Sequence, residues 1–89
     1  MPLTDLHPKV TSRFRRAFQK LSSDARLQAA QALLQLRKDP MYPSLHTKKV
    51  HGLPGVYEAR ASRSMRILWQ YGGPNTIILI DIGPHNILP

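Results

Sequence analysis

Two arginines in the last third of the chain have the spacing that phosphate binding requires. Arg60 lies in an alternating run over residues 56–61, and Arg66 lies in a second apolar run over residues 65–71. If Ser62-Arg63-Ser64 forms the turn between two antiparallel strands, the two arginines lie directly opposite one another on the same face of the sheet. Two guanidinium groups at that separation repel unless an anion lies between them, and their planar donor groups suit phosphate oxygens. The sequence therefore predicts a phosphate-binding arginine pair, formed by Arg60 and Arg66.

A histidine follows the last expected strand and supplies a group suited to proton transfer. His85 comes after Gly83-Pro84, just past an apolar run over residues 76–82. Cleavage of RNA without a metal ion requires a base for the 2′-hydroxyl, an acid for the leaving 5′-oxygen and cations for the transition state. We expect His85 to perform one of the proton transfers, and the arginine pair to perform the electrostatic part. The alternatives are that His85 only caps the end of a strand, or that one arginine forms an ion pair with Glu58 or Asp81.

The net charge of the chain indicates the class of partner. The 89 residues carry a formal charge of +8 and have a pI near 10.7. A small domain this basic attracts anions, so nucleic acid is the leading candidate, an acidic protein is the second, and a basic domain without a specific ligand is the third. The chain has no cysteine, which excludes disulfides and thiolate metal sites and is typical of the reducing cytoplasm. We expect a single cytoplasmic domain over residues 1–89, because no apolar run is long enough for a signal peptide or a bilayer span.

The remaining titratable residues do not form a recognisable metal or cofactor site. The five acidic residues are scattered along the chain and form no carboxylate cluster for metal-assisted catalysis. His46 and His51 lie in a run with Lys48 and Lys49, whose charges repel a divalent metal ion. No glycine-rich phosphate motif and no catalytic triad are recognisable. We therefore expect neither a metal ion nor a cofactor.

Two helices are expected to precede and support the strands. The first is predicted to begin near Pro8, with one apolar stripe formed by Val10, Phe14, Ala17, Phe18 and Leu21. The second is predicted to begin after a cap at Ser22 or Ser23 and to end at Asp39-Pro40. Its broad apolar side is formed by Leu27, Ala30, Leu33, Leu34 and Leu36. A short turn between the two helices makes an αα-hairpin.

The rest of the chain is predicted to form a small sheet. Residues 56–61, 65–71 and 76–82 are predicted to be the three antiparallel strands of a meander, with the second turn over residues 72–75. A short first strand or an extended segment is expected at residues 3–6, and residues 40–55 are expected to form a loop because of their prolines and glycines. The sequence therefore predicts an α+β domain in which an N-terminal αα-hairpin packs on one face of a small antiparallel sheet. The other face would then be open to a polyanion.

The order of these segments resembles a known family. In a short basic chain that begins with two helices, the stretches KKVHGLPGVYEARAS, SMRILWQY and IGPHNIL resemble the RelE/ParE superfamily of bacterial toxins, and its RelE-like members in particular. The resemblance covers the chain from about Pro8 onward. It implies the toxin of a type II toxin–antitoxin system. RelE-like members cleave mRNA at the ribosomal decoding site, whereas ParE-like members inhibit DNA gyrase.

The resemblance also implies roles for individual residues. Arg60 and Arg66 match the strand arginines that bind and polarise the scissile phosphate, and His85 matches a C-terminal histidine that is used for proton transfer. The residues expected to contact mRNA or ribosomal RNA are Arg63, Lys48, Lys49, Arg13, Arg16 and Lys20. The implied partners are the ribosome with its mRNA and an acidic antitoxin that covers the arginines or the helices. The resemblance thus implies a metal-independent endoribonuclease that inhibits translation.

One departure from the family pattern bears on activity. Many RelE-like toxins place a tyrosine or phenylalanine a few residues after the histidine, where this chain has Asn86, Ile87, Leu88 and Pro89. Two alternatives to an mRNA endonuclease therefore stay open. One is a gyrase inhibitor, which needs no proton-transfer group. The other is an RNA-binding protein without catalytic activity, whose affinity falls steeply as salt rises.

Overall fold

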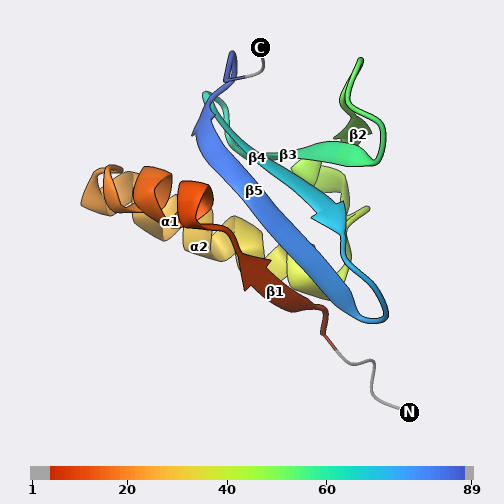
Figure 1. The fold of residues 1–89 in the computed structure, drawn as a ribbon. Helices are drawn as coiled ribbons and strands as arrows, with labels where there is room; N and C mark the ends of the chain where they lie inside the picture. The colour runs from red at the N-terminus through yellow and green to blue at the C-terminus, as the bar shows by residue number, and fades with distance from the viewer. Residues whose placement is uncertain (1–4, 88–89) are drawn as a thin grey trace.

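A strand near the N-terminus joins the C-terminal half of the chain in one mixed sheet. The computed structural model describes residues 5–87. In chain order, its elements are β1 (His7–Val10), α1 (Ser12–Gln19), α2 (Ser23–Lys38), the 3-10 helix η1 (Pro43–Leu45), β2 (Lys48–Lys49), β3 (Val56–Ser62), β4 (Met65–Tyr71) and β5 (Thr76–Pro84). The sheet order is β1-β5-β4-β3-β2, and the helices lie against the sheet (Figure 1). The predicted α+β class is confirmed. The sheet is larger than predicted and mixed, because β1 runs parallel to β5 while the other pairs are antiparallel.

The first helix begins later than the sequence pattern predicts. Residues 7–10, which were expected to lie at the start of the helix or just before it, form β1 and pair with β5. Helix α1 begins only at Ser12, after Thr11. The side-chain oxygen of Thr11 accepts a hydrogen bond from the backbone N–H of Phe14 at 3.1 Å, which caps the helix. The pairing of this segment with β5 overrides the helical spacing of its apolar residues.

Strand β1 lies at the edge of the sheet, and its outer side is largely closed to another strand. The short first strand was predicted at residues 3–6, but the observed strand starts later, at His7. Residues 3 and 4 lie outside the described part of the chain. The backbone N–H of Leu6 donates to the carbonyl of Arg37 at 2.8 Å, and the Leu6 carbonyl accepts from Nε of Arg37 at 3.0 Å. The next position that faces outward is Pro8, which has no N–H to offer.

The second helix is confirmed at both ends, but the segment after it is not only a loop. The Ser22 side chain accepts a hydrogen bond from the backbone N–H of Ala25 at 3.1 Å, and Asp39 caps the C-terminal end. The segment over residues 40–55 contains η1 and the short strand β2, so the prediction of an uninterrupted loop is wrong. The two lysines of β2 pair with β3, and one of them faces a buried glutamate there.

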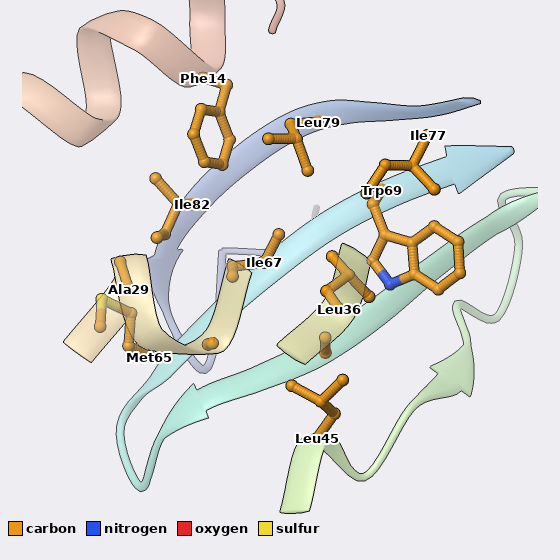
Figure 2. Packing of buried hydrophobic residues seen from close by; sticks show 12 residues of the cluster. Phe14, Ala29, Leu36, Leu45, Met65, Ile67, Trp69, Ile77, Leu79 and Ile82 are labelled. Carbon is orange, nitrogen blue, oxygen red and sulfur yellow. The ribbon is translucent and has the colours of Figure 1, made fainter. Parts of the chain in front are cut away.

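The hydrophobic core lies between the helices and one face of the sheet. Its buried members come from both helices, η1 and strands β3, β4 and β5. Figure 2 shows Phe14 of α1 directed toward Leu79 and Ile82 of β5, whereas Leu36 of α2 is directed toward Trp69 of β4. Neither helix in the described part of the chain has the length and hydrophobicity needed to span a bilayer.

Helix α2 packs on the sheet through two alanines and Leu36, and only part of the leucine side that the sequence suggested faces the core. The buried residues are Ala29, Ala32 and Leu36, whereas Leu27 and Leu34 are 61% and 54% exposed. Apolar residues surround most of this helix, so their spacing does not reveal which side faces the core. The small alanines allow a close approach to the sheet, whereas Leu27 and Leu34 are left on the outer surface.

A bulge in β5 changes the alternation of its side chains. Trp69 pairs with Leu79 and Ile67 pairs with Ile82, and all four side chains face the helices. Two residues lie between the paired positions on β5 but only one lies between them on β4, so Ile80 is the extra residue. The Thr11 hydroxyl lies 2.9 Å from the carbonyl of Leu79 and 3.1 Å from that of Ile80, which ties the start of α1 to the bulge.

Candidate nucleic-acid interface

The face of the sheet opposite the helices, here called the arginine face, is organised in three rows across β3, β4 and β5. Paired residues of neighbouring strands share a face, so the registers define the rows directly. The rows are Arg60–Arg66–Gly83, Glu58–Leu68–Asp81 and Val56–Gln70–Ile78. Neighbouring rows are separated by about 6.8 Å, because two residues of an antiparallel strand span that length. The row of arginines therefore lies next to a row with a carboxylate at each end.

Arg60 and Arg66 form the pair that the sequence predicts, although the turn between them differs. They are directly opposite in the register of β3 and β4. The turn has two residues, 63–64, and a bulge between Arg60 and Ser62 keeps the arginines opposite one another. In directly opposite positions the Cβ atoms are about 4.5–5.5 Å apart. Two guanidinium groups thus share one small area, which suits a single phosphate.

Both carboxylates of the neighbouring row are buried and have other partners. Glu58 is 6% exposed, and its Oε1 lies 3.3 Å from Nζ of Lys48. Asp81 is 9% exposed; its Oδ2 accepts from Nε of Arg13 at 3.0 Å, and its Oδ1 accepts from the backbone N–H of Ile82 at 2.8 Å. Within residues 5–87, no carboxylate forms an ion pair with either member of the arginine pair. Lys48 and Arg13 neutralise the two acids, so the positive charge of the arginine pair is left for an external anion.

Arg66 has a second, structural contact that the sequence did not indicate. Its Nη1 lies 2.9 Å from the carbonyl oxygen of Ser62, 3.2 Å from that of Arg63 and 3.1 Å from that of Met65. Charged donors bind backbone carbonyls more strongly than neutral donors do. Arg66 therefore holds the β3–β4 turn in place, and the turn in turn fixes the position of its guanidinium group.

His85 lies in a turn directly after β5, at the end of the arginine row. The turn is closed by the backbone N–H of Ile87, which donates to the carbonyl of Pro84 at 3.0 Å. Gly83, the row partner of Arg66, is covered by Ile87: a Cβ atom added at Gly83 would collide with Cγ2 of Ile87. The side chain of His85 is exposed. The structure thus places an accessible imidazole two residues beyond the glycine that pairs with Arg66.

The side chains of the two lysines of β2 point to opposite faces of the sheet. Neighbouring residues of a strand point to opposite sides. Lys48 lies opposite Glu58 and belongs to the arginine face, whereas Lys49 lies opposite Tyr57, which packs against the core on the helix side. Of these two residues predicted to bind RNA, the structure brings only Lys48 toward the arginine pair.

The basic residues of α1 form a ridge beside β5. Arg13, Arg16 and Lys20, here called the basic ridge, are exposed and follow one another at spacings of three and four residues. Arg13 reaches Asp81 of β5, so the ridge borders the arginine face on that side. Arg63 is exposed in the β3–β4 turn, next to the pair. Of the predicted cations, Lys48 and Arg13 contact the row beside the arginine pair, and Arg63 lies in the turn next to it.

A second surface that sequence reasoning missed is an apolar groove between β1, α1 and α2. It encloses about 470 Å³ and is lined by Val10, Phe14, Phe18, Leu33 and Leu34 among others. Two arginines, at positions 15 and 37, also line it, and among the described residues no acidic side chain does. The excess of apolar residues on α2 was the available signal, because a helix with one packed side needs only one apolar stripe. We call this surface the apolar groove.

Comparison with known proteins supports the fold. No protein-family model matches the sequence, and no curated protein matches it significantly. The structure is similar to a RelBE2 toxin–antitoxin complex from Mycobacterium tuberculosis, with a TM-score of 0.77, 18% identity and coverage of 94% of this chain and 95% of that chain. It is similar to an archaeal RelE–RelB complex from Pyrococcus horikoshii, with a TM-score of 0.76, 16% identity and coverage of 94% and 99%. A YoeB/ParE toxin from Agrobacterium tumefaciens gives a TM-score of 0.77 at 12% identity, with coverage of 90% and 99%. The chain therefore has the fold of the RelE/ParE superfamily of toxins.

Proposed function

We propose that this protein is the toxin of a type II toxin–antitoxin system and that it cleaves mRNA on the ribosome without a metal ion. The proposal rests on the arginine pair, which has no carboxylate partner within residues 5–87. Gly83 lies in the same row, and the exposed His85 follows it two residues later. Similarity to toxins of this fold supports the class of function.

In the proposed mechanism the scissile phosphate lies between Arg60 and Arg66. The guanidinium groups stabilise the negative charge that develops on the phosphorus oxygens when the 2′-hydroxyl attacks. His85 transfers one of the two protons, either from the 2′-hydroxyl or to the leaving 5′-oxygen. Lys48, Arg63 and the basic ridge bind flanking phosphates and hold the RNA in register. Since the turn carbonyls already hold Arg66 in position, little reorganisation is needed when the substrate binds.

A DNA gyrase inhibitor is the main alternative, because the same fold includes a protein described as a YoeB/ParE toxin. A non-catalytic RNA-binding protein is the second alternative. Neither requires a group for proton transfer beside the arginine pair, so the exposed position of His85 favours cleavage. The experiment below separates the three possibilities.

The proposed antitoxin contact is the apolar groove. We propose that an acidic amphipathic helix of the antitoxin lies in it, with its apolar side against Leu33 and Leu34 and its acids near Arg15 and Arg37. The argument is charge complementarity, because a chain with a net charge of +8 and a groove lined by cations attracts an acidic segment.

The edge of the sheet next to the groove favours a helix over an added strand. Strand addition requires a row of backbone donors and acceptors that face outward. Directly before β1, both backbone groups of Leu6 are already bonded to Arg37, and within β1 Pro8 lacks an N–H. The outer edge of β1 is therefore a poor template for pairing.

Cleavage by purified protein on ribosomes programmed with a defined mRNA, read by primer extension, tests the proposal. The wild type should give discrete cleavage, and the upstream fragment should end in a 2′,3′-cyclic phosphate, which is the product of attack by the 2′-hydroxyl. His85→Ala should abolish cleavage, and Arg60→Ala should slow it about 30- to 1000-fold, which corresponds to about 2–4 kcal/mol of lost transition-state stabilisation. Lys49→Ala is the matched control, because this cation lies on the other face of the sheet.

The same assay shows which reading fails. If His85→Ala cleaves at the wild-type rate, the assignment of proton transfer is wrong. If the wild type does not cleave ribosome-bound mRNA but inhibits DNA supercoiling by gyrase, the protein is a gyrase inhibitor. Binding to ribosomes or RNA without either activity would leave only the non-catalytic function.

A further inference from the structure

A polar groove lies beside the free edge of β3, on the side of the molecule where α2 and η1 meet the sheet. It encloses about 640 Å³, and it is lined by Gln28, Gln31 and Gln35 of α2 together with Arg60 and Arg63 of β3 and its turn. We call it the glutamine groove. Its remaining lining consists of Ala32, Ser44, Leu45, Ala61 and Ser62. Among the described residues, no acidic side chain lines it, so it is uncharged on the helix side and positive on the strand side.

The glutamines face the groove because of their spacing on α2. Residues three and four positions apart lie on the same side of a helix, and Gln28, Gln31 and Gln35 follow this pattern. Ala32 is in the same stretch and is buried, which places the glutamines at the border between the packed side and the solvent. Three uncharged amides in a row offer donors and acceptors at short intervals without repelling an anion.

The floor of the groove is apolar and the adjacent strand edge is unpaired. Ala32 and Leu45 are buried, and Ala61 packs partly against the core. Strand β2 pairs with β3 only at Tyr57 and Glu58, so the edge from Arg60 onward has no neighbouring strand. A flat ring can therefore lie on an apolar surface while its edge meets amide and guanidinium groups.

Arg60 connects this groove to the arginine face. Its backbone position puts it opposite Arg66 in the arginine row, and the same residue also lines the glutamine groove at the edge of the sheet. An RNA strand with one phosphate at the arginine pair would thus carry a neighbouring nucleotide around the edge of β3 toward α2. The charge of Arg63 at the other end of the groove would bind the next phosphate.

We propose that the glutamine groove binds a purine base of the RNA strand next to the scissile phosphate. This inference rests on the proposed function and adds a determinant of substrate sequence to it. Only purines present N7 beside an exocyclic group; glutamine binds N6 and N7 of adenine in a bidentate manner, and arginine binds O6 and N7 of guanine. Pyrimidines offer no such pair, so the groove should favour a purine at that position.

An extended acidic peptide paired with the edge of β3 is the competing occupant. The bulge between Arg60 and Ser62 interrupts the regular spacing of backbone groups at this edge, which disfavours strand addition there. The amide row on α2 would also contribute little to a peptide whose affinity comes from backbone pairing. The nucleotide is therefore the better match.

The test measures binding of single-stranded hexanucleotides to the free protein by fluorescence anisotropy at a fixed, low salt concentration. Each hexamer carries a 2′-deoxy sugar at the central position, so that it cannot be cleaved there. The wild type should bind a hexamer with a purine beside the central phosphate about tenfold more tightly than the matching pyrimidine hexamer. The double variant Gln31→Ala with Gln35→Ala should lose this preference but keep the affinity for the pyrimidine hexamer and its dependence on salt.

Two controls make the result specific. Gln19→Ala removes an exposed glutamine of α1 that does not line the groove, and it should leave the preference unchanged. Gln35→Glu places a negative charge in the groove and should weaken the binding of both hexamers. Circular dichroism of each variant verifies the fold.

Equal binding of both hexamers by the wild type would overturn the inference, as would a double variant that keeps the preference. Loss of binding to an acidic peptide in the double variant, without any purine preference in the wild type, would assign the groove to a protein partner instead. Because the readout is binding without cleavage, the result does not depend on the ribosome assay. If the protein prefers purines but does not cleave mRNA, the proposed purine site is supported and the proposed activity is refuted.

Discussion

Repulsion between the two charges of the arginine pair should lower the free energy of unfolding, and this effect can be measured. Two like charges about 6 Å apart repel by about 0.7 kcal/mol in a medium like water and by about 3 kcal/mol at an effective dielectric constant of 20. Arg60 is exposed, so the lower value applies. Arg60→Gln keeps most of the side chain and removes the charge. We therefore expect it to raise the free energy of unfolding by about 0.5–1 kcal/mol at low salt.

Arg66→Gln should have the opposite effect, although it removes the same repulsion. The variant loses the charged donor that holds three carbonyls of the β3–β4 turn, at distances of 2.9–3.2 Å. Contacts of this kind, partly exposed as they are here, contribute about 1–2 kcal/mol together. The loss of the turn contacts outweighs the gain from reduced repulsion, so the free energy of unfolding should fall by about 1 kcal/mol.

The assay is urea unfolding followed by the fluorescence of Trp69, which is the single tryptophan of the chain and is fully buried. The double variant completes a thermodynamic cycle, in which the coupling between the two positions reports the repulsion alone. At 1 M salt the screening length is about 3 Å, so the gain in Arg60→Gln should vanish there. Both single variants should still lose the proposed cleavage activity, because each removes a proposed contact with the phosphate.

The reasoning is refuted if Arg60→Gln is less stable than the wild type at low salt. It is also refuted if the coupling is the same at low and at high salt, since charge repulsion in solvent must be screened. Lys49→Gln serves as the control, because it removes one exposed cation from the other face of the sheet and tests whether any loss of charge gives the same gain.

Three further predictions concern the surroundings of the site. Gly83→Ala should displace Ile87 and with it the turn that carries His85, the proposed catalytic residue, so kcat should fall at least tenfold while binding of RNA changes little, as measured by single-turnover cleavage and anisotropy. Asp81→Ala should lower the free energy of unfolding by about 1–3 kcal/mol, because it removes the acceptor for a buried backbone N–H and the partner of Arg13; urea unfolding measures this. Burial, and to a lesser extent nearby negative charge, raises the pKa of Tyr71 above its usual value near 10. The contribution of this group to stability is therefore complete below pH 10 and is lost as the pH rises through the higher folded-state pKa. Ultraviolet titration at 295 nm measures the pKa, and alkaline unfolding measures the loss of stability.

Each of these predictions has its own opposing outcome. Wild-type kcat in Gly83→Ala would show that the turn tolerates the collision or that its position is irrelevant to cleavage. Asp81→Asn keeps an acceptor for the backbone N–H, so a loss as large as that of Asp81→Ala would mean that the ion pair with Arg13 contributes most of the effect. For Tyr71, the variant Tyr71→Phe should unfold less readily at high pH, and an unchanged alkaline transition would contradict the assignment.

The meander of β3, β4 and β5 was accessible from the sequence, because it depends on local alternation, whereas the positions of β1 and β2 in the sheet were not. The register that sets Arg60 opposite Arg66 follows from two alternating runs and a short turn, and it survives even though the turn itself was assigned wrongly. The start of α1 was not accessible in the same way. Residues 7–10 carry a helix-compatible pattern, but a long-range pairing with β5 determines their conformation.

The same distinction applies to the site. That Asp81 is neutralised by Arg13 depends on a contact between segments far apart in the chain, and that Glu58 is neutralised by Lys48 depends on the short strand β2, which the sequence did not indicate. The side of α2 that faces the core was likewise undetermined, because apolar residues occur nearly all around the helix. The apolar groove and the glutamine groove both follow from this orientation, so neither could be located before the helix was placed.

The extra residue in β5 has a consequence that reaches beyond the core. Before Ile80 the odd-numbered side chains of the strand point toward the helices, and after it the even-numbered ones do. The bulge thus shifts the phase of the strand, and this shift delivers Asp81 and Gly83 to the arginine face. If the same residues kept a regular alternation with no bulge, Asp81 would point into the core and the C-terminal segment would turn toward the helices. The bulge therefore couples the packing of this protein to the placement of its proposed catalytic group.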